Sequence, residues 1–185
     1  KLYYDITAFL FNLTQSISQR QDSSGADYFV NAGGDNQRGI ETYLNYKIFE
    51  SSPSFIKHIE IWLSESWNQS KYKNYKVNAD DYSGNKLPGI PSNTFAAGLD
   101  ISSHGGFSGH ITYNYTSQIP LNDANVVKAG SYNLLGLRLD YQHSICKTFG
   151  IEIFCGADNL LNEKYSLCND INAAGGRYYN AAPGI

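Results

Sequence analysis

Cations and aromatic rings alternate within one short stretch of the chain, residues 68–93, and this combination can bind an anionic ligand that carries aromatic groups. The stretch contains Lys71, Tyr72, Lys73, Tyr75, Lys76 and Tyr82. Lysine attracts an anion by charge, and the face of an aromatic ring attracts cations. We take Lys73, Tyr75 and Tyr82 as candidate ligand-binding residues. The alternative is an ordinary solvated loop.

A second candidate lies near the end of the chain, where Arg177, Tyr178 and Tyr179 follow one another. The planar guanidinium group of arginine donates several hydrogen bonds and can contact an anionic chelate. The alternative is that the three side chains only pack the loop that contains them. With the earlier three, they complete a set of six candidate ligand-binding residues.

The remaining reactive side chains give no pattern for catalysis or for a metal. The four histidines, His58, His104, His110 and His143, are scattered and none is paired at metal-ligand spacing. No Ser-His-Asp order, carboxylate pair or phosphate-binding loop is found. We therefore expect no enzymatic activity, no metal site, no haem ligation and no cofactor.

The three cysteines, Cys146, Cys155 and Cys168, also lack metal-type spacing, and their number is odd. A disulfide between Cys146 and Cys155 across a hairpin is conceivable, because spacing alone does not fix the distance between two thiols. Free thiols are the alternative.

Charge and hydropathy exclude two further classes of protein. The net charge of −3 gives no basic surface for nucleic acid. No apolar run approaches the ~20 residues of a transmembrane helix. The chain has no methionine, residues 1–5 read as the interior of a strand, and residues 181–185 read as the tail of a loop. We therefore expect a part of a longer protein.

Seven segments alternate apolar and polar residues with a period of two, which predicts an all-β protein with an antiparallel up-and-down sheet. They cover residues 9–18, 40–48, 55–67, 95–101, 107–115, 135–141 and 149–157. Short connections near 51–54, 103–106 and 144–148 alternate with long polar ones near 21–38, 68–92, 118–130 and from 162 onward. Short turns on one side and long loops on the other are typical of an outer-membrane barrel.

The alternation also predicts which face of the sheet each side chain takes. The expected apolar face consists of Phe9, Phe11, Ile59, Ile61, Leu63, Leu99, Ile111, Tyr113, Leu137, Leu139, Ile151 and Ile153. The expected polar face carries Lys47, Glu60, Asp100, Arg138, Asp140 and Glu152. Charges spread along strands suit a wet interior, and an apolar face suits lipid.

Aromatic residues close the apolar face at both ends. Phe55, Phe107 and Phe149 follow the short turns, and Trp67 and Tyr115 end two of the same strands. Two such girdles flank the apolar band of ~25 Å in a transmembrane barrel. A soluble β-sandwich would also alternate, but its core would not require them.

The segment Asp158–Tyr165 reads D-N-L-L-N-E-K-Y and is followed by Asn169–Asn172 and Gly176–Gly184. This segment resembles the end of TonB-dependent receptor barrels, and Leu87–Pro91 and Asp123–Asn125 add to the likeness. Within the motif we expect Asp158 and Asn159 to fix the exit from the strand into the loop, not to act in catalysis or metal binding.

The resemblance implies a barrel of about 22 strands, of which residues 1–185 would form a C-terminal portion of seven. It places the plug domain and the TonB box upstream, and the closing strand after the end of the chain. The strand at 2–19 would then pair with upstream sequence, and the strand at 149–161 with the closing strand.

The implied function is active import of a scarce nutrient across the bacterial outer membrane. The implied partners are a ferric siderophore or other iron chelate, the TonB protein and outer-membrane lipid, without nucleic acid. The alternative is a small self-contained barrel of about eight strands, acting as an adhesin, an anchor or an enzyme; single-chain bacterial barrels have even strand numbers.

Overall fold

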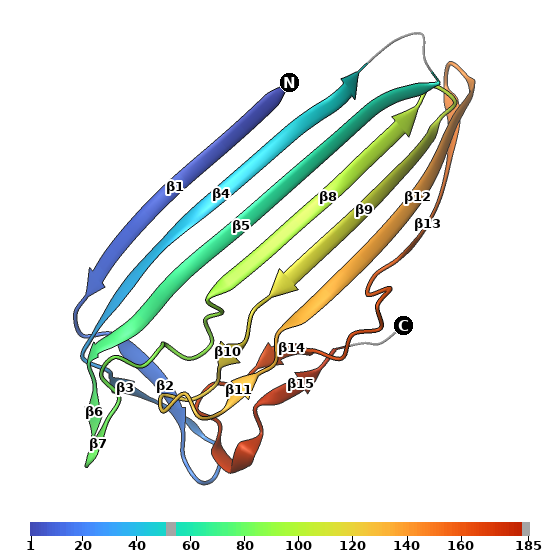
Figure 1. Ribbon diagram of the computed structural model, residues 1–185. Coiled ribbons are helices and arrows are strands. Elements are labelled where there is room, and N and C mark those ends of the chain that lie inside the picture. Colours follow the sequence, from blue (N-terminus) through green and yellow to red (C-terminus); the bar gives the residue numbers. More distant parts are fainter. Residues whose placement is uncertain (51–54, 183–185) are drawn as a thin grey trace.

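In the computed structural model, which describes residues 1–50 and 55–182, one curved antiparallel sheet runs the length of the molecule (Figure 1). Its described strands, in spatial order, are β1 (Leu2–Leu13), β4 (Gly34–Glu50), β5 (Ile56–Asn74), β8 (Asn93–Ser103), β9 (Phe107–Thr116), β12 (Tyr132–Cys146) and β13 (Phe149–Ala157). Each strand pairs with the next one along the sheet, so the predicted all-β, up-and-down topology is confirmed.

The long connections are not extended loops, because each one forms a small hairpin at the same end of the sheet (Figure 1). These hairpins are β2–β3 (Ile17–Gln21, Asp27–Asn31), β6–β7 (Lys76–Val77, Asp80–Asp81), β10–β11 (Ile119–Pro120, Lys128–Ala129) and β14–β15 (Ser166–Asn169, Tyr179–Ala181). A 3-10 helix spans Ala174–Gly176. Within the described ranges, no helix is long and apolar enough to cross a membrane.

The opposite end of the sheet carries the short turns. The turn after Ser103 contains Gly106 at φ 85°, where a Cβ would lie 2.0 Å from the carbonyl oxygen of Gln142. Cys146 and Phe149 flank the next turn as predicted, whereas the predicted turn at 51–54 falls outside the described residues. We call the two ends of the sheet the turn end and the loop end.

The predicted strand at 9–18 was wrong beyond Leu13. Gln15 takes a left-handed conformation at φ 58°, which ends β1, and residues 17–21 turn away to pair with β3. The Ser16 N–H donates to the Gly33 carbonyl, which closes the base of the new hairpin. Alternation continued through the break because β2 is itself a strand.

Directly paired residues of an antiparallel sheet share a face, so the register sorts the side chains. Tyr46, Ile61, Leu99, Ile111 and Leu137 form one continuous row across β4 to β12. Ile59, Leu63, Tyr113, Leu139, Ile151 and Ile153 lie on the same face, which we call the outer face. These predicted positions are confirmed.

Phe9 and Phe11 were predicted on this face and lie on the opposite, inner face. They pair with Gly39 and Gln37, whereas the neighbouring Ile40 pairs with Trp67 of the outer face. β1 carries apolar residues on both of its faces, so the alternation of its sequence does not indicate which residues face outward. The two rings stack with centroids 5.5 Å apart, and a Cβ on Gly39 would lie 2.6 Å from Phe9 Cζ.

The inner face gathers all six charged residues that were predicted there. Lys47, Glu60, Asp100, His110 and Arg138 occupy one row across five strands. Asp100 Oδ1 lies 2.6 Å from His110 Nδ1, and Arg138 Nη2 lies 2.6 Å from Asp140 Oδ1. Each of these charged side chains therefore has a partner of opposite charge or a polar neighbour on the inner face.

The cysteines do not form the disulfide considered from sequence. Cys146 stands opposite Phe149 and Cys155 opposite Leu139, so the two thiols do not face each other across the β12–β13 hairpin. Among the described residues, Cys146, Cys155 and Cys168 are free and exposed.

The outer face has no second layer over it in the part of the chain that the structure describes. Its side chains are bare, with Leu10 66% and Ile153 63% exposed. The buried apolar clusters lie instead among the hairpins at the loop end, around Tyr72 and Leu121. This arrangement contradicts a β-sandwich, whose core would lie between two sheets.

We predict that Ile111→Arg lowers the free energy of unfolding of the complete protein in phospholipid vesicles by about 2–4 kcal/mol, because a cation at mid-membrane loses its hydration. Asn114→Arg, on the inner face of the same strand, is the matched control and should change little. Urea unfolding followed by tryptophan fluorescence measures both. Equal losses for the two variants would show that lipid does not cover the outer face.

Candidate functional site

Asp123 joins the hairpins at the loop end. Its side chain is buried, with 2% exposure of the residue, between β10 and β11. Arg20 Nη2 donates to its carboxylate at 2.6 Å, the Tyr72 hydroxyl at 2.7 Å and the Tyr75 hydroxyl at 3.2 Å. Asn172 Nδ2 donates a further bond at 3.1 Å. We call Asp123 with these four donors the Asp123 cluster.

The backbone of Asp123 is held by the same segments. Its N–H donates to Asn172 Oδ1 at 2.9 Å, and its carbonyl accepts from Asn85 Nδ2 at 2.8 Å. Asn172 Nδ2 also donates to the carbonyl of Gln19 at 3.2 Å. Residues from four separate loops therefore meet at one carboxylate.

The sequence suits these positions because asparagine tolerates left-handed backbone and offers both donors and acceptors. Asn125 at φ 58° and Asn172 at φ 51° both take this conformation. The Asn125 side chain accepts from the Lys86 N–H and donates to the Lys86 carbonyl, both at 2.8 Å. The Asn125 side chain thus joins two neighbouring loops with the same pair of hydrogen bonds that a paired strand would make to the backbone of Lys86.

Burial and charge shift the titration of the cluster. Burial opposes the charge on the Arg20 guanidinium, but hydrogen bonds to Asp123 and Tyr75 outweigh it and raise the pKa of Arg20. Burial, together with the negative charge of Asp123, raises the pKa of Tyr75 above its ordinary value. The neutral phenol is therefore the form that the cluster stabilises.

A polar cavity of about 190 Å³ opens beside the Asp123 cluster. Its lining consists of Arg20, Gln21, Tyr28, Tyr82, Asn122, Asp123, Ala124, Asn172 and Tyr178. Arg20 Cζ lies 6.0 Å from the centroid of the Tyr82 ring and 5.8 Å from that of Tyr75. A guanidinium, aromatic rings and amide groups therefore converge on one small space, which suits an oxygen-rich group with aromatic or anionic character.

The six predicted residues divide between this cavity and other places. Tyr82 and Tyr178 line it together. Tyr75 is only 2% exposed and its hydroxyl accepts from Arg20 Nε at 3.2 Å, so it holds the loops together and does not face solvent. Lys73 and Arg177 are exposed outside the cavity.

Tyr179 belongs to a second cavity, of about 350 Å³, together with Tyr132, Lys164 and Tyr165. The rings of Tyr132 and Tyr165 stack with centroids 4.8 Å apart, and the Tyr179 hydroxyl donates to the Lys128 carbonyl at 3.0 Å. The structure thus separates Tyr179 from its sequence neighbour Tyr178.

Sequence reasoning missed Arg20, Tyr28 and Asp123. Arg20 and Asp123 are 103 residues apart, and no local pattern marks either as the partner of the other. The nearest signal was the segment Asp123–Asn125, noted only for its likeness to a family.

Within the motif Asp158–Tyr165, Asn159 has the structural role expected for it. Asn159, at φ 56°, accepts from the Glu163 N–H at 2.8 Å and donates to the Glu163 carbonyl at 3.0 Å. These bonds close the turn that leaves β13. Within the described ranges, no group of three or more His, Cys, Asp or Glu side chains could hold a metal ion.

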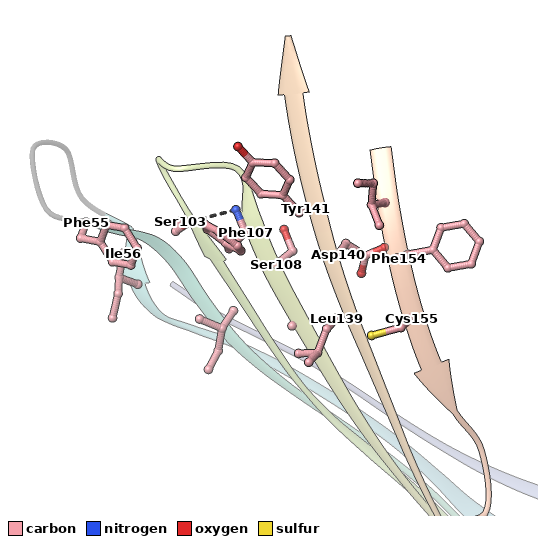
Figure 2. Close-up of a pocket in the computed structure, with 13 residues that line it drawn as sticks. Phe55, Ile56, Ser103, Phe107, Ser108, Leu139, Asp140, Tyr141, Phe154 and Cys155 are labelled. Atoms are coloured by element: carbon pink, nitrogen blue, oxygen red, sulfur yellow. Dashed lines mark hydrogen bonds between the residues drawn. The ribbon is translucent and has the colours of Figure 1, made fainter. Parts of the chain in front are cut away.

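A larger hollow, of about 650 Å³, lies on the outer face at the turn end (Figure 2). Gly109 stands between Ile101 and Leu139 in one row, and its missing side chain leaves the gap. Phe107 and Tyr141 border the gap, whereas Phe154 points away from it (Figure 2). The hollow is apolar and belongs to the exposed outer face, far from the loop-end cavity.

Comparisons with known proteins identify the fold. A family model described as "TonB dependent receptor-like, beta-barrel" matches residues 1–160. The unliganded ferric citrate transporter FecA superposes with a TM-score of 0.75 at 17% identity, over 99% of this chain and 27% of its own. The ferric yersiniabactin uptake receptor FyuA from Yersinia pestis gives 0.69 at 17% identity, over 99% and 26%.

A third solved structure, the siderophore receptor PiuA from Acinetobacter baumannii, gives a TM-score of 0.67 at 17% identity, over 98% of this chain and 24% of its own. At these identities the likeness concerns the fold. The chain spans about a quarter of the length of these proteins.

We predict that Asp123→Asn in the complete protein loosens the hairpins at the loop end by about 3 kcal/mol, because it leaves the partly buried Arg20 without its counter-charge. Hydrogen exchange of residues 17–31, 75–92 and 119–129 should accelerate together. The control is Asp170→Asn, an exposed carboxylate on a nearby loop. Acceleration confined to 119–129 would show that the carboxylate does not couple the loops.

The raised pKa of Tyr75 predicts a loss of stability at high pH. A group whose pKa is raised on folding stabilises the folded state below its unfolded pKa, ~10 for tyrosine. That contribution disappears as the pH rises through the folded value. A difference absorbance titration of wild type against Tyr75→Phe should therefore show one phenol ionising above the bulk of the tyrosines, with loosening of the loops. Ionisation of Tyr75 at or below pH 10 would contradict this account.

Proposed function

Since this chain belongs to the TonB-dependent receptor β-barrel family, we propose that its complete protein is an outer-membrane receptor that imports a ferric siderophore or other iron chelate. Energy for import comes from the TonB system, and no reaction is catalysed on the ligand. The described residues supply a sector of the barrel wall and part of the outer vestibule.

The proposal assigns residues 1–185 to the C-terminal portion of a barrel of about 22 strands, with the plug domain upstream. Two observations support it. The chain covers only 24–27% of the receptors that it superposes on. In addition, β1 and β13 each pair with a single neighbour within the described residues, so the sheet is open at both edges.

The open sheet also weighs against a small self-contained barrel. Such a barrel closes by pairing its first and last strands, because in lipid each backbone N–H and C=O needs a partner. The described strands β1 and β13 do not pair, and they lie at opposite edges of the sheet (Figure 1). Barrel diameter grows with strand number, so this gentle curvature fits a wide wall.

One observation carries the ligand assignment, namely the cavity where Arg20 meets Tyr28, Tyr82 and Tyr178 at the loop end. In an outer-membrane barrel the long loops face outward, so this cavity opens toward arriving ligand. Lys73, Arg177 and Tyr179 are exposed elsewhere on the same loops and add two cations and a ring to the loop-end surface. An iron chelate offers the anionic oxygens and, in many siderophores, the aromatic rings that such a surface attracts.

Growth of a deletion strain on single iron sources tests the function. The strain should fail on at least one ferric chelate and recover with the wild-type gene. Recovery should be lost with Tyr82→Ala/Tyr178→Ala, which we expect to weaken binding of that labelled chelate roughly tenfold through lost ring contacts.

Tyr141→Ala, at the turn end, is the control for the double variant. Both variants need surface levels equal to wild type, measured by outer-membrane fractionation. Unimpaired growth of the deletion strain on every iron source would refute iron import. Normal uptake by the Tyr82/Tyr178 variant would refute only the cavity.

A further inference from the structure

Three cations lie on the outer face beyond the aromatic girdle at the loop end. Arg38 pairs with Gln69, two residues along β5 from Trp67, and Lys71 pairs with Asn36 two residues further. Lys86 forms a bridge with Lys71 from the other side of β5. Because Ile40 and Trp67 pair on the outer face, alternation places Arg38 and Lys71 there too. We call Arg38, Lys71 and Lys86 the basic rim.

The heights of these residues place Arg38 within the headgroup layer of a bilayer and Lys71 a few ångströms above it, within reach of a long side chain. A strand rises ~3.3 Å per residue and a barrel strand tilts by ~40°. Arg38 therefore lies about 5 Å, and Lys71 about 10 Å, beyond the level of Trp67. The headgroup region adds about 5–7 Å on each side of the hydrocarbon core, and long cationic side chains reach several ångströms along an apolar surface.

The charges of the basic rim have no counter-ion within the described residues. Arg38 donates to the neutral Gln69 side chain, with its Nε 2.7 Å from Oε1. Lys86 Nζ donates to Ser92 Oγ at 2.7 Å. By contrast, Lys76 in the adjacent hairpin has Asp81 at 3.3 Å. On the outer face below the rim, the Glu65 carboxylate accepts instead from Asn93 Nδ2 at 2.9 Å.

The pairing of Lys71 with Lys86 brings two like charges together. The Leu87 N–H donates to the Ser70 carbonyl and the Tyr72 N–H to the Asn85 carbonyl, at 3.0 and 2.9 Å. Lys71 and Lys86 therefore form a non-hydrogen-bonded pair, in which side chains lie closest. Like charges directly opposite each other destabilise a sheet. An anion bridging both ammonium groups would relieve that repulsion.

We propose that the basic rim binds the phosphate groups of outer-leaflet lipid headgroups. The proposal rests on the outer-membrane placement of the preceding subsection. Its occupant is a lipid because the rim continues the exposed apolar face, with Leu10, 66% exposed, directly opposite Arg38 on β1 and Trp67, 43% exposed, below it. Acyl chains would cover that face while the phosphates meet Arg38, Lys71 and Lys86.

Native mass spectrometry of the complete receptor in detergent tests the proposal, with lipid A, a bisphosphorylated glycolipid, as the probe. We expect lipid A to stay bound and its dephosphorylated form to dissociate. Lys71→Gln/Lys86→Gln should weaken lipid A binding roughly tenfold or more, since each cation near an anionic surface contributes appreciably. Lys71→Arg/Lys86→Arg should retain binding.

Lys57→Gln/Lys147→Gln removes two exposed lysines near the turn end and serves as the matched control, with no expected loss. Wild-type affinity in the Lys71/Lys86 glutamine variant would overturn the proposal. Displacement of lipid A by inorganic phosphate at equal concentration would also overturn the proposal, because it would show that the basic rim is a site for free phosphate. Fractionation of the cell envelope separates this proposal from the proposed outer-membrane function. A protein that is found in the outer membrane but does not bind lipid A would refute only the role of the basic rim.

Discussion

The pairing of backbone polar groups is the constraint on which the rest of the structure depends. A strand that crosses hydrocarbon must hydrogen-bond each N–H and C=O to a neighbouring strand. The described strands pair in one continuous ladder from β1 to β13, which is open only at the outer edges of these two strands. Once the ladder is fixed, alternation divides the side chains between a largely apolar outer face and a charged inner face. The apolar row from Tyr46 to Leu137 and the charged row from Lys47 to Arg138 lie next to each other along the strands, and the same register sets both.

This constraint leaves the sheet without a core of its own, so packing moves to its loop end. There the four hairpins bury Tyr72, Tyr75 and Leu121 and direct their polar groups to the carboxylate of Asp123. A buried carboxylate must be paired and hydrogen-bonded to be tolerated. Arg20 and the two phenols meet that requirement, and the same contacts set the walls of the polar cavity. Loop order and cavity shape therefore have one physical cause.

Sequence patterning predicts the wall well and the loops poorly. Ile61, Leu99 and Ile111 were assigned correctly because each polar neighbour fixes the phase, whereas Phe9 was misplaced because β1 is apolar on both faces. The spacing of Lys73, Tyr75 and Tyr82 indicates cations and rings but not which ring is buried. Arg20 and Asp123 come into contact only because the strands between them pair in the observed register. No local sequence motif marks their contact.

Iron anomalous diffraction from crystals of the complete receptor, grown with the ferric chelate that supports growth, tests the central claim most directly. That claim is that the loop end of this wall faces the ligand. The account predicts an iron peak on the loop-end side, with the chelate in contact with Tyr82 or Tyr178. A chelate bound at full occupancy without touching any residue of these four loops would contradict it.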